Sequence, residues 1–181
     1  MERILKVREV TAGDIDAIVS YWKDAPISYL KAMGIDTGDL SRFNGMAVGI
    51  RAELAVPYTE KKTFHLVAEF DGQAIGHTYV NKVQFGETAF VHLHLWRGTP
   101  KGQKLGSRMV AAAIPFFFEK LELQELLCEP AAANPAPNRT IERLGFELVK
   151  TYETVPAGWN FILEVNQWKL SRRRCKELFG N

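Results

Sequence analysis

Several features that mark specialised proteins are scarce or missing in this sequence. It contains two cysteines, Cys128 and Cys175, and neither has metal-ligand spacing with the four histidines. We interpret both as buried free thiols of a protein from a reducing compartment, not as parts of a disulfide framework or a zinc site. No apolar run approaches the roughly 20 residues that a membrane-spanning helix requires.

Charge of one sign is not in excess either. The 23 basic and 21 acidic residues leave a net charge of +2, which argues against a dedicated nucleic-acid-binding protein. The first ten residues, MERILKVREV, are charged and alternating, unlike a secretory signal. With 181 residues, 46% of them hydrophobic, we expect one cytoplasmic domain over residues 1–181, with neither a membrane nor a nucleic acid as partner.

The hydrophobic pattern predicts a mixed α/β fold. Strands are expected where apolar and polar residues alternate, over residues 5–10, 64–70, 74–83, 87–96, 126–128, 146–152 and 160–170. Helices are expected where the apolar period lengthens to that of a helix, over residues 15–23, 51–56, 105–121, 138–144 and 172–178. Asp71 and Gly72 mark a tight hairpin turn.

The irregular stretch 24–62 has the composition of a lid or substrate wall. Its candidates for contact with the acceptor, by composition alone, are Tyr29, Arg42, Phe43 and Arg51.

The segment VHLHLWRGTPKGQKLGS, residues 91–107, joins a strand to the longest helix. Side chains two apart on a strand share a face, so His92 and His94 lie on one side of the sheet with Trp96. Histidine titrates near neutral pH, so both imidazoles are candidates for proton transfer. The alternative is that they are packed histidines with one hydrogen bond each.

The turn after this strand is basic and rich in glycine. Unpaired backbone N–H groups at a helix start bind phosphate, Gly102 and Gly106 permit close approach, and Lys101 and Lys104 add positive charge. A P-loop is excluded because Gln103 stands where its second glycine belongs, and a dinucleotide fingerprint is excluded because the preceding strands pair as hairpins. Taken alone, the segment is equally compatible with an ordinary strand-to-helix loop.

A second block, EPAAANPAPNRTIERLGF at residues 129–146, completes a family pattern. Together the two blocks resemble the GNAT superfamily of acyl-CoA-dependent N-acyltransferases. In that family Arg/Gln-x-x-Gly-x-Gly/Ala opens a helix, and a short strand and a helix ending in Leu-Gly-Phe follow. Here the first part reads KGQKLG at residues 101–106 and the similarity extends from Leu5 to about Leu170. The implied fold is a central mixed, mostly antiparallel sheet flanked by helices.

The resemblance implies acetyl-CoA as cosubstrate and no metal. It assigns the pyrophosphate to the backbone amides of residues 101–107 and the pantetheine arm to the strand edge at residues 95–97. Asn134 is implied as a further partner of pantetheine, or else it caps the helix that follows. The cofactor-binding residues implied are Leu95, Trp96, Arg97, Lys101, Gly102, Gln103, Lys104, Leu105, Gly106, Ser107 and Asn134.

This chain departs from the family pattern at three positions. Lys104 replaces the first signature glycine, Lys101 replaces the usual Arg or Gln, and Pro137 replaces the usual serine. The Cβ of Lys104 either crowds the pyrophosphate or leaves room for its ammonium group to bind a phosphate. Proline is tolerated in a first helical turn, so the helix at Pro137 is expected to form.

Acyl transfer to an amine requires the neutral amine, and a nearby base supplies it. Members of the family commonly place this base on the strand that carries His92 and His94, and His92 is the better-matched position. Many members protonate the leaving thiolate with a tyrosine, where this chain has Ile141. Tyr79 and Tyr152 match no motif, and Glu129 is interpreted as a paired structural carboxylate.

The acceptor is expected to be an amine of a small molecule or of a peptide or protein N-terminus. The C-terminal half resembles the branch that modifies ribosomal proteins and drugs, and the Glu129-Pro130 pair resembles siderophore acyltransferases of hydroxylysine. Ala131 replaces the aspartate expected in the latter group. A GNAT-fold module that binds CoA without transferring acyl groups is the rival interpretation. A homodimer is implied by the resemblance alone.

Overall fold

The computed structural model describes residues 4–33, 37–38, 41–155 and 162–180. Its strands are β1 (Leu5–Glu9), β2 (Phe64–Phe70), β3 (Gln73–Gln84), β4 (Thr88–Leu95), β5 (Glu125–Cys128), β6 (Glu147–Thr154) and β7 (Leu163–Ser171). Its α-helices are α1 (Ile15–Lys23), α2 (Ile27–Ala32), α3 (Met46–Leu54), α4 (Leu105–Lys120), α5 (Pro135–Arg143) and α6 (Arg172–Phe179). Short 3-10 turns cover Ala12–Asp14, Ser41–Phe43 and Tyr58–Glu60.

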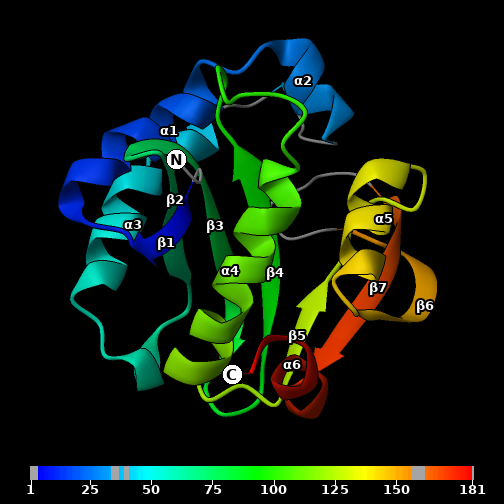
Figure 1. The fold of residues 1–181 in the computed structure, drawn as a ribbon. Helices are drawn as coiled ribbons and strands as arrows, with labels where there is room; N and C mark the ends of the chain where they lie inside the picture. Colours follow the sequence, from blue (N-terminus) through cyan, green and yellow to red (C-terminus); the bar gives the residue numbers. More distant parts are fainter. Residues whose placement is uncertain (1–3, 34–36, 39–40, 156–161, 181) are drawn as a thin grey trace.

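The strands form one seven-stranded sheet in the order β1-β2-β3-β4-β5-β7-β6. Every neighbouring pair is antiparallel except β4 and β5, which run parallel and pair only over residues 88–90 and 125–127. Beyond those three residues the two strands diverge, as Figure 1 shows. The mixed, mostly antiparallel sheet expected from the sequence is confirmed, and its one parallel pair opens at the end where β4 leads into α4.

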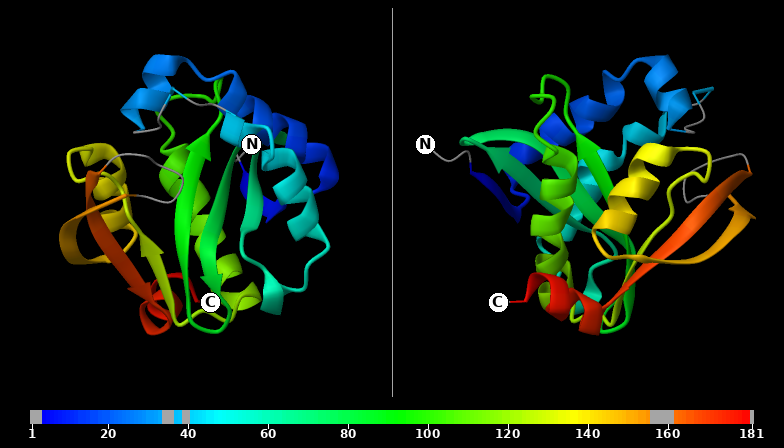
Figure 2. Two further views of the ribbon diagram at one scale, coloured as in Figure 1. Left: turned by 180° about the vertical axis from the view of Figure 1, so that it is seen from behind. Right: turned by 45° about the vertical axis from the view of Figure 1, so that its right-hand side comes forward.

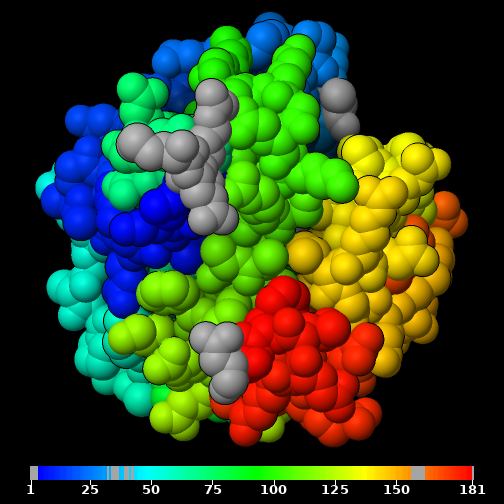
Figure 3. Space-filling model, viewed as in Figure 1, coloured from blue at the N-terminus to red at the C-terminus, as the bar shows by residue number. Residues whose placement is uncertain are grey.

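Helices cover both faces of the sheet (Figures 1 and 2). The longest helix, α4, packs on one face, where its Leu105 and Met109 join Ala68 and Phe70 in a buried cluster. Figure 3 shows this face, with α6 seated beside α4 at the lower end. On the opposite face α1 and α3 pack against the sheet through a second cluster of Val10, Ile15, Ile18, Ile50 and Val67.

Alternation along β4 sends its side chains to these two faces. Val91 is buried in the main core on the α4 side, and Leu93 packs against that core. His92 and His94 therefore project to the α1 and α3 side, as the period of two predicts. The prediction of one shared face for the two histidines is confirmed by their cross-strand partners Tyr79 and His77.

Element boundaries differ from expectation in two places. The helix α5 begins at Pro135, three residues before the expected start, because Asn134 accepts a hydrogen bond from the Ala136 N–H and proline suits a first helical turn. The stretch 24–62 holds α2 and α3, and α3 begins at Met46 where a helix was expected over 51–56. Of the expected strand 160–170, residues 160 and 161 lie outside the described residues and β7 begins at Leu163.

Two further expectations were met. The hairpin between β2 and β3 turns at Asp71 and Gly72, both with positive φ of 51° and 80°, the backbone of a type I′ turn. The C-terminal helix expected over residues 172–178 is α6, and Ser171 caps it by accepting a hydrogen bond from the Arg174 N–H at 3.2 Å.

Candidate active site

The open edge of β4 is the first component of the candidate site. Among the described residues, no strand pairs with residues 91–95 on the side away from β3. The Trp96 N–H donates to the Ile75 carbonyl at 2.8 Å, so the backbone groups of Trp96 face β3. Because N–H and C=O groups alternate sides along a strand, those of Leu93 and Leu95 face the open edge. They can pair with an amide-containing ligand arm laid beside the strand.

The loop from β4 to α4 is the second component. Gly98 and Gly102 adopt positive φ, and a Cβ at either would meet nothing within 4 Å, so the loop is open there. A Cβ at Gly106 would lie 3.4 Å from a methyl group of Leu95, which is van der Waals contact, so α4 packs closely on β4 at this glycine. The first N–H groups of a helix lack intrahelical partners and carry the positive end of its dipole. An open loop before unpaired helix amides is the arrangement that a phosphate group requires, and phosphate binding here stays a prediction.

Lys104 takes the left-handed conformation at the N-cap of α4, with φ 52° and ψ 31°. That backbone favours glycine, the residue that the family signature places there. The Lys104 side chain is exposed, so its ammonium group extends into solvent beside the unpaired amides. Ser107 donates its hydroxyl to the Lys104 carbonyl at 3.0 Å and closes the first turn of the helix.

The other predicted cofactor residues lie near this end of β4 or at α5. Arg97 donates to the Asp24 carbonyl at 2.7 Å and so ties the loop to the end of α1. The Trp96 indole lies on the histidine face, where it donates to His77 Nδ1 at 2.9 Å. Asn134 caps α5 with its side-chain oxygen. This is the capping role that the sequence also allowed.

All four histidines of the chain gather on one face of β2, β3 and β4. His65 lies opposite Tyr79, Tyr79 lies opposite His92, and His77 lies opposite His94. The rings stack across the strands, with centroids 4.7 Å apart for His65 and Tyr79, 4.6 Å for Tyr79 and His92, and 5.0 Å for His77 and His94. This histidine face is the third component of the site.

Hydrogen bonds orient three of the four imidazoles. His92 Nε2 lies 3.0 Å from Asn81 Oδ1, so in that arrangement Nε2–H donates and Nδ1 keeps its lone pair. His77 Nδ1 accepts from the Trp96 indole, so a neutral His77 carries its proton on Nε2. His94 Nδ1 lies 3.3 Å from the Tyr21 hydroxyl, which lies 2.8 Å from the hydroxyl of the exposed Tyr29.

Three ring nitrogens on this face are buried without a partner among the described residues, namely His65 Nδ1, His77 Nε2 and His94 Nε2. Buried polar atoms are usually satisfied, and an unpaired one costs about 1–3 kcal/mol. Three such atoms on one surface are typical of a place that holds a polar ligand or water.

Burial keeps these imidazoles neutral. It lowers the pKa of His65 and of His92 to about 4 and that of His77 to about 3, and it holds the pKa of His94 well below its usual range. Lys82 lowers the pKa of His92 further, and His77 does the same for His94. All four imidazoles are therefore neutral at pH 7.

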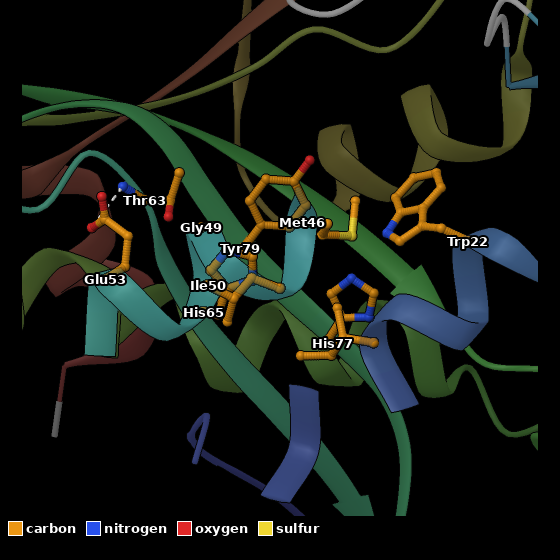
Figure 4. A pocket seen from close by; sticks show the side chains of 10 residues that line it. Trp22, Met46, Gly49, Ile50, Glu53, Thr63, His65, His77 and Tyr79 are labelled. Carbon is orange, nitrogen blue, oxygen red and sulfur yellow. Dashed lines mark hydrogen bonds between the residues drawn. The ribbon is translucent and has the colours of Figure 1, made fainter. Parts of the chain in front are cut away.

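A cavity of about 280 Å³ lies between α1, α3 and the histidine face. Figure 4 shows Trp22 and Met46 toward one end, Glu53 and Thr63 at the other, and His65, His77 and Tyr79 between them. A smaller hollow of about 130 Å³ adjoins it and shares its Glu53 and Thr63 wall. Of the four residues named by composition, three do not line the cavity: Phe43 is buried and stacks on Trp22, and Tyr29 and Arg51 are exposed. The side chain of the fourth, Arg42, lies outside the described residues.

Residues 5–147 match the family described as Acetyltransferase (GNAT) domain. The chain belongs to the GNAT acetyltransferase family. Among solved structures, spermidine N-acetyltransferase from Vibrio cholerae in complex with CoA and spermine is 14% identical, with a TM-score of 0.74 over 94% of this chain and 97% of that one. A search of curated protein sequences returned no match.

Other GNAT enzymes have a similar fold. The ribosomal L7/L12 alpha-N-protein acetyltransferase RimL, in complex with CoA, is 11% identical with a TM-score of 0.72, over 98% of this chain and 96% of that one. The putative acetyltransferase YncA from Salmonella typhimurium, with acetyl-CoA, is 16% identical with a TM-score of 0.70, over 93% and 94%. At these identities the likeness shows the fold alone.

Two positions of this GNAT chain bear on acid catalysis. Ile141, where many family members have a tyrosine, is buried in the main core. Glu129, at the end of β5, accepts hydrogen bonds from Tyr152 at 2.5 Å and Gln167 at 2.7 Å, so it is a paired carboxylate, as expected. Burial and Glu129 raise the pKa of Tyr152 to about 12, so its hydroxyl stays protonated.

Sequence reasoning missed four residues of the site, namely Tyr21, Glu53, His65 and His77. Tyr21 and Glu53 lie on helices whose packing the sequence does not determine. His65 and His77 each lie in a segment whose sequence predicts a strand, but their common face depends on the pairing of β2 with β3.

Among the described residues, no group of three or more His, Cys, Asp or Glu side chains is placed to hold a metal, and no helix is long and apolar enough to cross a membrane.

Proposed function

We propose that this protein transfers the acetyl group of acetyl-CoA to a primary amine, with His92 as the base. The observation that carries the proposal is that neutral histidines project from β4 at the point where its open edge meets the N-terminus of α4. Bound acetyl-CoA would supply an acetyl thioester, whose carbonyl carbon a neutral amine can attack, with cleavage of the C–S bond and departure of CoA as a thiolate. The chain would then supply the binding surface, the exclusion of water and the proton acceptor.

Two parts of the chain would bind the cosubstrate. The unpaired amides of the first α4 turn, with the Lys101 and Lys104 side chains, would bind the pyrophosphate. The backbone groups of Leu93 and Leu95 would pair with the amides of pantetheine, as an added strand does at a sheet edge. Asn134 is proposed as a further donor to that arm through its side-chain N–H₂.

His92 would take the amine proton at Nδ1. Its Nε2 is held by Asn81, which fixes the ring and stabilises the positive charge that protonation creates. Since burial lowers the pKa of His92 to about 4, the imidazole is unprotonated above about pH 5 but is a weak base, so it would relay the amine proton onward and not hold it as a stable cation. We expect the acid limb of the pH profile to reflect mainly the protonation of the amine substrate itself.

His94 offers a second acceptor with its own connection to solvent. In the tautomer in which Nδ1–H donates to Tyr21, the buried Nε2 is free to take a proton. The proton on Nδ1 can then pass to the hydroxyl of Tyr21 and on to that of Tyr29, which reaches the surface. We propose this chain of three residues as a route by which a proton leaves the site.

The acceptor class proposed from the family is an amine of a small molecule or of a peptide N-terminus. Three enzymes of similar fold are named for a polyamine, an aminoglycoside and a ribosomal protein as their substrates. The thiols of Cys128 and Cys175, both free, support a cytoplasmic location. A homodimer is proposed from the resemblance, and light scattering on the purified chain tests it.

Substitution of His92 by alanine tests the proposal. We expect kcat/KM for amine acetylation at pH 7 to fall about 100-fold or more, the usual share of a general base. The Kd of acetyl-CoA, measured by titration calorimetry, should stay within twofold. Gln84→Ala, an exposed change on the neighbouring strand, is the control and should leave both quantities unchanged.

The rival reading is a GNAT-fold module that binds CoA without transferring acyl groups. It predicts acetyl-CoA binding without release of CoA thiol for any amine in a broad panel. The same measurements separate the two readings. An unchanged turnover in His92→Ala would place the base elsewhere.

A further inference from the structure

We infer that the acceptor is a compact monoamine whose body is apolar or aromatic and carries an uncharged hydrogen-bond acceptor. This body would occupy the cavity between α1, α3 and the histidine face. The inference rests on the proposed function, because it names the substrate class of that same site. It sets this chain apart from enzymes whose acceptors carry several positive charges.

Apolar side chains form much of the cavity wall. Ile18 and Trp22 of α1 and Met46 and Ile50 of α3 line one side. The opposite side is made of stacked rings of the sheet, His65 and Tyr79 among them. Such a surface binds an apolar or aromatic body by contact and by removal of water. Its volume, about 280 Å³, is close to the lower limit of small-molecule sites, roughly 300 Å³, which favours a compact ligand.

The charge of the cavity argues against a polycation. Of the described residues that line it, Glu53 alone carries a full charge at pH 7, since His65 and His77 are neutral there. The Glu53 carboxylate already accepts hydrogen bonds from the Lys62 and Thr63 N–H groups, at 3.1 and 3.3 Å. A polyamine or aminoglycoside would bring several ammonium groups to a wall that offers one occupied carboxylate, and burying an unpaired charge is costly.

His77 supplies the polar contact. It is 0% exposed and lines the cavity. The Trp96 indole occupies its Nδ1, so the neutral ring presents Nε2–H, which has no partner among the described residues. Since the ring is fully buried in the unliganded protein, a ligand oxygen such as a hydroxyl, ether or carbonyl would satisfy this donor once a neighbouring side chain of the cavity wall moves aside. An ammonium group there would oppose it with a second donor. The structure therefore selects an uncharged acceptor atom on the body of the substrate.

Steady-state acetylation of matched amines tests the substrate class. The probes are 2-phenylethylamine, its ring-methoxylated and ring-hydroxylated forms, propylamine, spermidine and kanamycin. We expect kcat/KM for the best oxygenated aromatic amine to exceed that for spermidine or kanamycin at least 100-fold. A preference for spermidine or kanamycin would overturn the inference and leave the proposed function standing.

Gly49 allows the cavity to be filled without disturbing the fold. It lines the cavity from α3, its φ is not positive, and a Cβ there would meet nothing within 4 Å. We expect Gly49→Leu to lower kcat/KM for the aromatic amines at least tenfold and that for propylamine less than threefold. Gly45, at the start of the same helix and outside the cavity lining, has an equally open Cβ position. Gly45→Leu is the matched control and should change neither value.

His77→Phe tests the hydrogen bond. The ring stays but the donor is lost, so the preference for oxygenated over plain aromatic amines should fall to about one. A thermal melt checks that this variant folds, since the Trp96 indole loses its hydrogen-bond acceptor. If the variant does not fold, Gly49→Leu alone tests whether the substrate occupies the cavity. An unchanged preference in folded His77→Phe would show that His77 is not the contact.

Calorimetric titration of the aromatic amines into the CoA-bound protein separates the two proposals. Binding that Gly49→Leu weakens, without acetyl transfer, would refute the proposed function and keep the cavity assignment. Transfer to aromatic amines that Gly49→Leu leaves unchanged would refute the cavity assignment and keep the function. If no aromatic amine is either bound or acetylated, the cavity assignment is overturned.

Discussion

Lys104 is the residue at which the chain departs most clearly from its family, and the backbone shows the cost. A non-glycine residue in the left-handed region loses about 1 kcal/mol or more. Three other non-glycine residues, Asp71, Lys82 and Glu122, share a positive φ, but Lys104 alone of these opens a helix beside the open strand edge. A lysine stands at a position where glycine would be less strained, and its exposed side chain begins beside the unpaired amides of α4, which motivates a test of its ammonium group.

Two variants at this position separate strain from charge. We expect Lys104→Gly to raise the free energy of unfolding by about 1 kcal/mol, while Lys104→Ala should not raise it. Both should weaken acetyl-CoA binding about twofold to tenfold, because both remove the ammonium group. Denaturant unfolding and calorimetry supply the two measurements. Tighter binding in Lys104→Gly would instead show that the Cβ crowds the pyrophosphate.

Tyr21 can be tested at the same scale. The change Tyr21→Phe keeps the ring contacts with Trp22 and His94 but removes the hydroxyl that links His94 to Tyr29. We expect kcat to fall about twofold to tenfold, the value of one hydrogen bond, with the Kd of acetyl-CoA unchanged. Tyr58→Phe is the control, since its hydroxyl binds Glu9 away from the histidine face. Equal kcat in wild type and Tyr21→Phe would remove His94 from the proton route.

At the scale of elements, two irregularities in strand pairing bring the histidines together. The β2–β3 register shifts by one residue between Ala68 and Glu69, and the β3–β4 register shifts between Asn81 and Gln84. Counted from the hairpin turn without the first shift, His65 would lie opposite Thr78, and Tyr79 would point to the other face. A slip of one residue reverses every side chain of a strand. The histidine face therefore depends on β-bulges that re-aim β3.

The capping of α5 yields a second test at this scale. Asn134 accepts the Ala136 N–H and is proposed to donate to pantetheine. Asn134→Ala should cost about 1 kcal/mol of stability, while Asn134→Asp keeps the cap. Both should weaken acetyl-CoA binding about twofold to tenfold, because both lack the side-chain N–H₂. Unchanged affinity in both variants would leave Asn134 a cap alone.

At the scale of the whole molecule, the neutral histidines couple stability to pH. Their folded pKa values, about 3 to 4 for His65, His77 and His92, lie below the unfolded value of about 6.5. The unfolded chain therefore binds more protons below that pH, and stability present above pH 6.5 is lost as the pH falls toward 4. Each such histidine contributes a slope of up to about 1.4 kcal/mol per pH unit.

Urea unfolding between pH 7.5 and 4.5 measures this loss. Folded His77→Phe should show a shallower slope than the wild type, since one depressed titration is removed. The pair of Arg8 and Asp14 titrates lower, because Arg8 holds the pKa of Asp14 at about 2. It therefore contributes almost nothing to the slope above about pH 5 and only a small part of it between pH 5 and 4.5. A slope that does not change in His77→Phe would mean that this imidazole does not titrate as the fold implies.

Periodicity and motifs determined much of this protein from the sequence alone. The family was identified from its resemblance to two blocks, at residues 101–106 and 129–146. The seven strands, the hairpin at Asp71 and Gly72 and the long helix after Lys104 follow from patterns within a few neighbouring residues. So does the common face of His92 and His94, because residues two apart on a strand point the same way. These features are local, and the spacing of apolar and polar residues is enough to predict local geometry.

The tertiary structure decided which residues share the site. His65 and His77 join His92 and His94 only after two bulges fix the register, and a bulge reflects the packing of whole strands, not the pattern of one. Helix packing brings Tyr21 to His94 and places α3, with Gly49 and Glu53, against the sheet as a cavity wall. The burial that holds the imidazoles neutral likewise exists only once the elements have assembled, because desolvation depends on the surroundings of a group and not on its neighbours in sequence.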